Sequence, residues 1–134
     1  MKVLFMAGFG PIVPPGRQSE EEALYDSTLG LPFEREGTYL HTGAIEGVKH
    51  FALWPLDQAA ESCFGKPEWP DDLPVPAAWM EFDVENLQEA TEELEAAGYQ
   101  LLVSNRMEPW GQGVSRFLAP DGLLVGLTYT PWMR

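Results

Sequence analysis

The strongest constraint on the fold is an order of segments that occurs twice along the chain. A strand-like run, a helix and three further strand-like runs occupy residues 2–56, and the same order recurs over residues 77–130. In each unit one helix can cover one face of a small sheet, so the opposite face is free to form a cavity. We therefore predict an α+β fold and a single domain, residues 1–134, with module one at 1–56, a Pro-rich linker at 57–76 and module two at 77–134.

Module one reads as a strand at 2–9, extended past a bend by Ile12 and Val13, and then a helix. Ser19 with Glu22 three residues later forms a capping box, which predicts a helix running to about Thr28. Strands are expected at 33–36, 38–42 and 48–56, separated by glycines in the spacing of an antiparallel meander. Alternation along the last strand places four residues on one face, namely Val48, His50, Ala52 and Trp54.

Module two carries clearer local signals. A strand is predicted at 77–82, and Asn86 with Glu89 forms a second capping box for a helix that ends near Ala97. A short strand at 99–103 precedes two longer runs, 114–118 and 123–130, which are joined by an Ala-Pro-Asp-Gly turn. Proline and glycine preset the backbone of such a turn, so these runs are predicted to form a hairpin.

The charge balance excludes several classes of partner. Acidic residues number 21 against 8 basic ones, for a net charge of −13, so the surface repels nucleic acid and anionic membranes. The chain contains no apolar run near the roughly 20 residues that cross a bilayer, and its single cysteine, Cys63, has no partner within the chain. We expect a cytoplasmic protein in which Cys63 is a small, partly buried apolar residue.

Three segments together resemble the vicinal oxygen chelate superfamily, which includes glyoxalases, extradiol dioxygenases and bleomycin resistance proteins. They are Leu29-Gly30-Leu31-Pro32, Trp79-Met80-Glu81-Phe82-Asp83 before a helix, and Phe117-Leu118-Ala119-Pro120-Asp121-Gly122-Leu123-Leu124-Val125. The resemblance covers nearly the whole chain. It implies two βαβββ modules whose curved mixed sheets form a cupped cavity, commonly within homodimers.

The resemblance also implies where metal ligands would lie, and here the chain departs from the pattern. In the metal enzymes each module supplies two His or Glu ligands. Those positions fall on Ala77 and Gly126 in module two, and near Gly8 and Ala52 in module one. No side chain at these positions can bind a metal, so no metal cofactor is expected. Because all four residues are small, we expect them to surround an open cavity.

The same strand alternation and the resemblance select the candidate ligand-binding residues. These are His50, Trp54, Trp79, Glu81, Trp110, Gln112 and Arg116. Trp110 and Gln112 belong to a loop that the resemblance places at the mouth of the cavity. His50 and Glu81 are weak catalytic candidates, because they could act as a general acid and base if they came within hydrogen-bond distance. Each could equally be structural.

Three functions are open at this point. The leading hypothesis is metal-free binding of an aromatic or cationic small molecule, similar to proteins that confer antibiotic resistance by sequestering a drug. The second is a metal-independent isomerase, epimerase or lyase acting on a small carbonyl compound through His50 and Glu81. The third is a divergent metal-dependent lyase or dioxygenase with relocated ligands, drawn from His41, His50, Glu81 and Glu108. Whether the two modules pair within one chain or across a dimer is also open.

Overall fold

A computed structural model describes all 134 residues and contains one mixed sheet of eight strands in the order β2-β3-β4-β1-β5-β8-β7-β6. The first half comprises β1 (Val3–Val13), α1 (Gln18–Glu22), the π-helical segment η1 (Ala23–Thr28), β2 (Glu34–Glu36), β3 (Tyr39–Thr42) and β4 (Phe51–Pro55). Helix α2 (Leu56–Phe64) follows. The second half comprises β5 (Ala78–Val84), α3 (Leu87–Ala96), β6 (Leu101–Met107), β7 (Gly113–Leu118), β8 (Leu124–Tyr129) and the short 3-10 turn η2 (Pro131–Met133).

The two halves share one topology and meet within a single chain. In each half the first strand pairs in parallel with the last, β1 with β4 and β5 with β8. Between the halves, β1 and β5 pair antiparallel along most of their length, with Gly8 opposite Glu81 and Gly10 opposite Trp79. The predicted repeat of strand, helix and three strands is therefore present, and its modules join edge to edge through their first strands.

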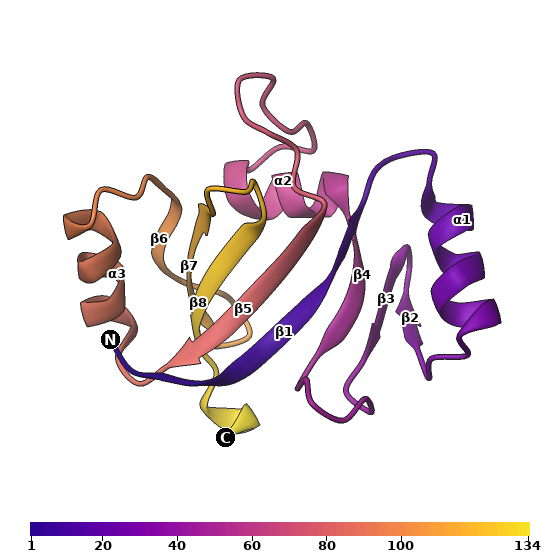
Figure 1. Ribbon diagram of the computed structural model, residues 1–134, viewed down its shortest axis with the longest axis horizontal. Helices are drawn as coiled ribbons and strands as arrows, with labels where there is room; N and C mark the ends of the chain where they lie inside the picture. Colours follow the sequence, from indigo (N-terminus) through magenta and orange to yellow (C-terminus); the bar gives the residue numbers. More distant parts are fainter.

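The helices occupy three separate places around the sheet. Helices α1 and α3 lie at opposite ends of the long axis, while α2 lies between them beside one end of the central strands (Figure 1). Helix α3 buries Leu87, Ala90 and Leu94 in a cluster with Val84 and Leu127 from the sheet. None of the helices combines the length and apolar composition needed to cross a membrane.

The two predicted capping boxes have different outcomes. Asn86 caps α3 as predicted, because its side-chain oxygen accepts a hydrogen bond from the N–H of Glu89 at 3.0 Å. Ser19 does not cap α1, and that prediction was wrong. The helix begins at Gln18, so Ser19 lies inside it. The preceding residue, Arg17, makes no side-chain cap, but its N–H donates to the Pro14 carbonyl oxygen at 3.1 Å. The predicted end near Thr28 is correct.

The segment expected to be a linker contains a full helix. Helix α2 places Ala59, Ala60 and Cys63 in the main apolar cluster, which also includes Trp79 of β5. Burial raises the pKa of the Cys63 thiol, which keeps it protonated, as expected of a cysteine that serves as an apolar residue. The helix therefore belongs to the core, and its polar side is available to the cavity described below.

A bulge in β6 changes which side chains face inward. From Val103 to Arg106 the strand uses one residue more than the paired segment of β7, and Asn105 has a φ of +45°. The N–H of Asn105 donates to the hydroxyl of Ser115 at 2.8 Å, so the displaced backbone group still has a partner. Since side chains alternate along a regular strand, the extra residue brings Arg106 onto the same face as Val103.

Replacing Gly10 with alanine is expected to destabilise the fold. A Cβ at this position would lie 1.8 Å from the carbonyl oxygen of Ala52 and 2.7 Å from the ring of Trp79. Overpacking of this kind costs roughly 1–3 kcal/mol, and backbone atoms cannot easily yield. Urea denaturation measures the loss. Gly43→Ala is the control, because its Cβ would meet only the Lys49 carbonyl oxygen at 3.5 Å; equal losses in both variants would contradict the prediction.

Candidate functional site

A cavity of about 800 Å³ opens over one face of the sheet. Both halves and α2 contribute to its wall, and all seven ligand-binding candidates from the sequence lie on it. The eighteen lining residues are Ala7, Glu36, Tyr39, His50, Trp54, Gln58, Glu61, Ser62, Trp79, Glu81, Arg106, Glu108, Trp110, Gln112, Arg116, Thr130, Trp132 and Met133. The volume lies within the range of sites for small organic molecules.

A row of four paired residues crosses the floor of the cavity. Gly8 of β1 lies opposite Glu81 of β5, Glu81 lies opposite Gly126 of β8, and Gly126 lies opposite Arg116 of β7. A Cβ on Gly126 would lie only 3.0 Å from Cγ of Glu81, and a Cβ on Gly8 would lie 3.7 Å from its Oε2. The two glycines therefore leave the space that the Glu81 side chain occupies.

The Glu81 carboxylate forms a buried ion pair with Arg116. Nη2 of Arg116 donates to Oε1 of Glu81 at 3.1 Å, and the two residues are only 4% and 8% exposed, respectively. The other terminal nitrogen, Nη1, donates to the hydroxyl of Ser62 on α2 at 2.6 Å. The guanidinium carbon lies 5.2 Å from the ring centre of Trp54, which adds a cation–π contact, while Nε is buried without a partner.

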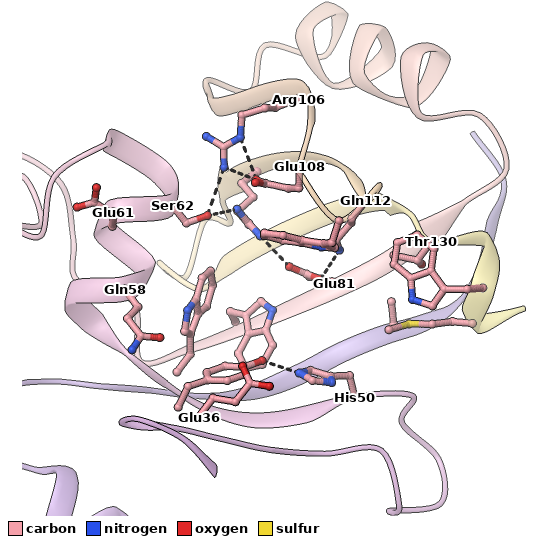
Figure 2. A pocket seen from close by; sticks show the side chains of 18 residues that line it. Glu36, His50, Gln58, Glu61, Ser62, Glu81, Arg106, Glu108, Gln112 and Thr130 are labelled. Carbon is pink, nitrogen blue, oxygen red and sulfur yellow. Dashed lines mark hydrogen bonds and ion pairs between the residues drawn. The ribbon is translucent and has the colours of Figure 1, made fainter. Parts of the chain in front are cut away.

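The second carboxylate oxygen of Glu81 connects to the mouth of the cavity. Nε2 of Gln112 donates to Oε2 of Glu81 at 3.3 Å, and the indole N–H of Trp110 donates to Oε1 of Gln112 at 3.0 Å. Trp110 is 64% exposed, so it lies at the rim. Figure 2 shows Glu81 beneath Gln112, with dashed lines reaching both of its oxygens. Trp110 therefore lies at the mouth, where the resemblance placed it, whereas Gln112 is only 9% exposed and lies against Glu81.

A second ion pair lies beside the first. Nη2 of Arg106 donates to Oε1 of Glu108 at 2.6 Å and to the hydroxyl of Ser62 at 3.3 Å (Figure 2). Ser62 therefore accepts hydrogen bonds from two guanidiniums, since Arg116 donates to the same oxygen. A continuous hydrogen-bonded network runs from the mouth through the floor to α2 and the β6 bulge.

The four small residues do not surround a void, so that expectation was wrong. Glu81 fills the space beside Gly8 and Gly126, as the short distances above show. Ala52 is fully buried in the apolar cluster, and Ala77 is exposed just before β5. The cavity lies above the ion pair, between its aromatic walls and α2.

On the opposite wall of the cavity, His50 forms a hydrogen bond with Tyr39. The hydroxyl of Tyr39 and Nε2 of His50 are 2.5 Å apart, and the two rings stack with that of His41. Burial, and then the neighbouring His41, lowers the pKa of His50, so its imidazole is neutral at pH 7. Burial raises the pKa of the Tyr39 hydroxyl, which keeps it protonated. No hydrogen bond joins His50 to Glu81, although both line the cavity.

The donors needed for a metal ion are not assembled. No three His, Cys, Asp or Glu side chains are placed to hold one, and this includes the relocated set of His41, His50, Glu81 and Glu108. Both oxygens of Glu81 already accept hydrogen bonds from Arg116 and Gln112. The residues present therefore do not fit the metal site that the resemblance implies.

Reasoning from the sequence did not identify several lining residues. Ser62 and its neighbours on α2 were assigned to a linker, and Arg106 faces the cavity only because of the bulge in β6. Strand alternation could have found Tyr39, which lies on the same face as His41. No local signal marks the segment from Thr130 to Met133. Its position depends on hydrogen bonds from Thr130 to Asp83 of β5, which is distant in the sequence.

Removing Arg116 is expected to destabilise the protein through Glu81. Arg116→Met leaves a buried carboxylate without its cation, which costs about 3–5 kcal/mol in the free energy of unfolding. The double variant Glu81→Gln with Arg116→Met should lose less than the single variant, because no unpaired charge is buried. Urea denaturation of the wild type, Glu81→Gln, Arg116→Met and the double variant gives the coupling energy between the two side chains. Simple additivity of the two single effects would count against this account of the pair.

The buried imidazole predicts a dependence of stability on pH. Because the pKa of His50 is lowered below 6.5 in the folded state, the unfolded chain binds its proton at a higher pH. The wild type should therefore be most stable relative to His50→Gln above pH 6.5, and this advantage should shrink as the pH falls toward 5. Unfolding measured from pH 8 to 5 tests the sign. A difference that grows on acidification would refute it.

Several solved structures share the fold of this chain. A structure of a glyoxalase/bleomycin resistance protein/dioxygenase superfamily member from Vibrio splendidus 12B01 aligns with a TM-score of 0.58 at 13% identity, covering 91% of this chain and 97% of that one. A structure of NAD-dependent benzaldehyde dehydrogenase from Legionella pneumophila gives a TM-score of 0.56 at 14% identity, covering 91% and 96%.

A third similar structure is that of 2,2',3-trihydroxybiphenyl 1,2-dioxygenase from the dibenzofuran-degrading Sphingomonas wittichii strain RW1, with a TM-score of 0.50 at 15% identity. It covers 98% of this chain but only 43% of the dioxygenase. At such identities the likeness shows the fold alone. No curated protein sequence matches the chain.

The sequence model of one family matches residues 16–127, which is most of the chain. Together with the paired modules described above, this match shows that the protein belongs to the glyoxalase/bleomycin resistance protein/dioxygenase superfamily.

Proposed function

We propose that the protein binds a small aromatic molecule, neutral or cationic, in the cavity and does so without a metal ion. The observation that carries this proposal is the composition of the wall. Four of the five tryptophans of the chain line the cavity, and the buried charges of its floor are paired with each other. The superfamily includes bleomycin resistance proteins, and sequestration of a toxic compound is the role we favour.

The aromatic lining sets the class of ligand. Trp54 and Trp79 meet edge to face with ring centres 5.3 Å apart, and Tyr39 lies on the adjacent strand. Indole and phenol rings offer broad apolar surfaces that favour planar ligands by stacking. Trp110 and Trp132, which are 64% and 54% exposed, extend this surface toward solvent. A ligand could therefore contact aromatic groups from the mouth inward.

The charges disfavour an anionic ligand. Among the lining residues carboxylates outnumber guanidiniums by four to two, and both guanidiniums are already paired with carboxylates. Glu36 and Glu61 are the two carboxylates without an arginine partner, and Glu36 lies 3.2 Å from Nε2 of His41. The net charge of −13 also attracts cations toward the protein from a distance.

Binding is favoured over catalysis because the two candidate catalytic groups are engaged elsewhere. Glu81 is held by Arg116 and Gln112, and His50 is held by Tyr39. A second candidate function is a metal-independent isomerase, epimerase or lyase, and the neutral imidazole of His50 beside the cavity is the observation in its favour. That alternative requires turnover that is lost in His50→Gln. A homodimer and a cytoplasmic location complete the proposal and rest on the family resemblance and the lone cysteine.

A fluorescence titration tests the proposed function. Proflavine, a planar aromatic cation, should quench tryptophan emission saturably, whereas the anionic dye anilinonaphthalene sulfonate should bind at least roughly tenfold more weakly. Trp110→Ala should weaken proflavine binding about fivefold, since an exposed stacking contact contributes roughly 1 kcal/mol.

Trp69→Phe serves as the control for this titration. Trp69 lies outside the cavity, where its indole N–H donates to the Pro74 carbonyl oxygen at 2.9 Å. Proflavine should bind this variant as tightly as the wild type. Trp79→Ala would not isolate a ligand contact, because Trp79 is 4% exposed and its loss would disturb the core. Equal affinity for cation and anion, or no effect of Trp110→Ala, would contradict the proposal.

A further inference from the structure

The segment from Thr130 to Arg134 forms one wall of the cavity through three of its residues. Thr130, Trp132 and Met133 all line the cavity. The segment folds as a single 3-10 turn, in which the N–H of Met133 donates to the Thr130 carbonyl oxygen at 3.0 Å. One such turn has little stability of its own, so its position depends on contacts with the rest of the protein.

Those contacts converge on one carboxylate of β5. Asp83 is fully buried, and its Oδ1 accepts hydrogen bonds from both the N–H and the hydroxyl of Thr130, each at 2.7 Å. Its Oδ2 accepts from Nε of Arg134 at 3.0 Å. Arg134 also donates to the Val84 carbonyl oxygen at 3.2 Å and lies over the ring of Tyr129. Asp83 therefore holds the segment at its two ends.

Trp132 lies between these two anchors and depends on them. Its side chain makes no hydrogen bond within the protein and the residue is 54% exposed. An indole held so loosely would move freely if either end of the turn were released. The three charge-assisted hydrogen bonds to Asp83 are of the strong class, which suits an anchor that must hold a largely exposed segment.

The same strand holds the other exposed indole of the cavity by a similar arrangement. Glu81, two residues before Asp83 and on the same face of β5, holds Gln112, and Gln112 accepts the indole N–H of Trp110. Two neighbouring carboxylates of β5 thus each position one tryptophan at the rim. Both indoles are exposed at the rim and held by carboxylates. An aromatic surface that is already fixed in place binds a ligand at a lower cost in conformational entropy.

We propose that Trp132 is a specificity-determining residue that contacts the aromatic ring of the ligand, and that Asp83 is the positioning residue that makes this contact possible. The inference rests on the proposed function and deepens it. It assigns recognition of the planar ring to the rim of the cavity, where the two anchored indoles lie, and assigns to Asp83 a role through Thr130 and Arg134, with no contact to the ligand.

The first test observes Trp132 without any ligand. Protein labelled with 5-fluorotryptophan contains five tryptophans, and the fluorine resonance of Trp132 is assigned by its loss in Trp132→Phe. Arg134→Gln should move that resonance toward the value of unfolded protein and leave that of Trp69 unchanged. Arg134→Lys should restore part of the shift, because a lysine can still donate to Asp83. An unchanged Trp132 resonance in Arg134→Gln overturns the proposal.

The second test measures proflavine binding in the same variants. Arg134→Gln should weaken binding about fivefold, mostly through faster dissociation. Asp83→Asn should weaken it further, and Arg134→Gln carries the test if that variant does not fold. Arg35→Gln is the matched control, because Arg35 pairs with Glu22 at 2.7 Å outside the cavity lining; its affinity should equal that of the wild type.

The outcomes separate this inference from the proposed function. A released Trp132 with unchanged proflavine affinity overturns the role in recognition while the proposed function stands. Failure of the wild type to bind proflavine or other aromatic amines overturns the proposed function and the ligand contact together, and the fluorine spectra still decide whether Asp83 anchors the segment. Release of Trp132 together with weaker binding supports the proposal.

Discussion

The buried ion pair between Glu81 and Arg116 is the interaction on which the rest of the site depends. Two charges in a low-dielectric interior need hydrogen bonds beyond the ion pair itself to offset the cost of removing them from water. Ser62 of α2, Gln112 of the loop and the face of Trp54 each satisfy one side of the pair. The position of α2, the course of the β6–β7 loop and the aromatic wall are therefore linked to one another through the charges that they surround.

Much of the fold could be predicted because its signals are local. Asn86 at the start of α3, Gly122 in the β7–β8 turn with φ +88°, and the alternation along β4 each depend on only a few neighbouring residues. The error at Ser19 has a physical reason. The turn closed by Arg17 starts the helix through backbone hydrogen bonds, so the serine falls inside the first turn, where it cannot act as a cap.

Seven of the eighteen residues that line the cavity could be predicted from the sequence, but the contacts between them could not. Alternation along single strands is enough to show which residues share a face. Which side chains meet depends on register between strands, and no local pattern reveals that Gly126 lies between Glu81 and Arg116. The glycines were interpreted as room for a ligand, yet they make room for a neighbouring side chain. Arg106 was missed because the predicted strand ended at residue 103, whereas β6 continues to Met107 and its bulge turns Arg106 toward the cavity.

A fixed guanidinium at the floor changes what the cavity can select. A metal ion would demand a ligand with oxygen donors, whereas a pair of charges that cancel each other places no such demand on the molecule above it. Selection must then come from shape and stacking at the walls, and the largest exposed aromatic surfaces there are Trp110 and Trp132. Both are held through carboxylates of β5, Glu81 and Asp83, so one strand sets the charge of the floor and the geometry of the mouth. In the proposed function the ligand is therefore selected by a flat ring, which stacking recognises, and by the lack of negative charge, which the acidic wall disfavours.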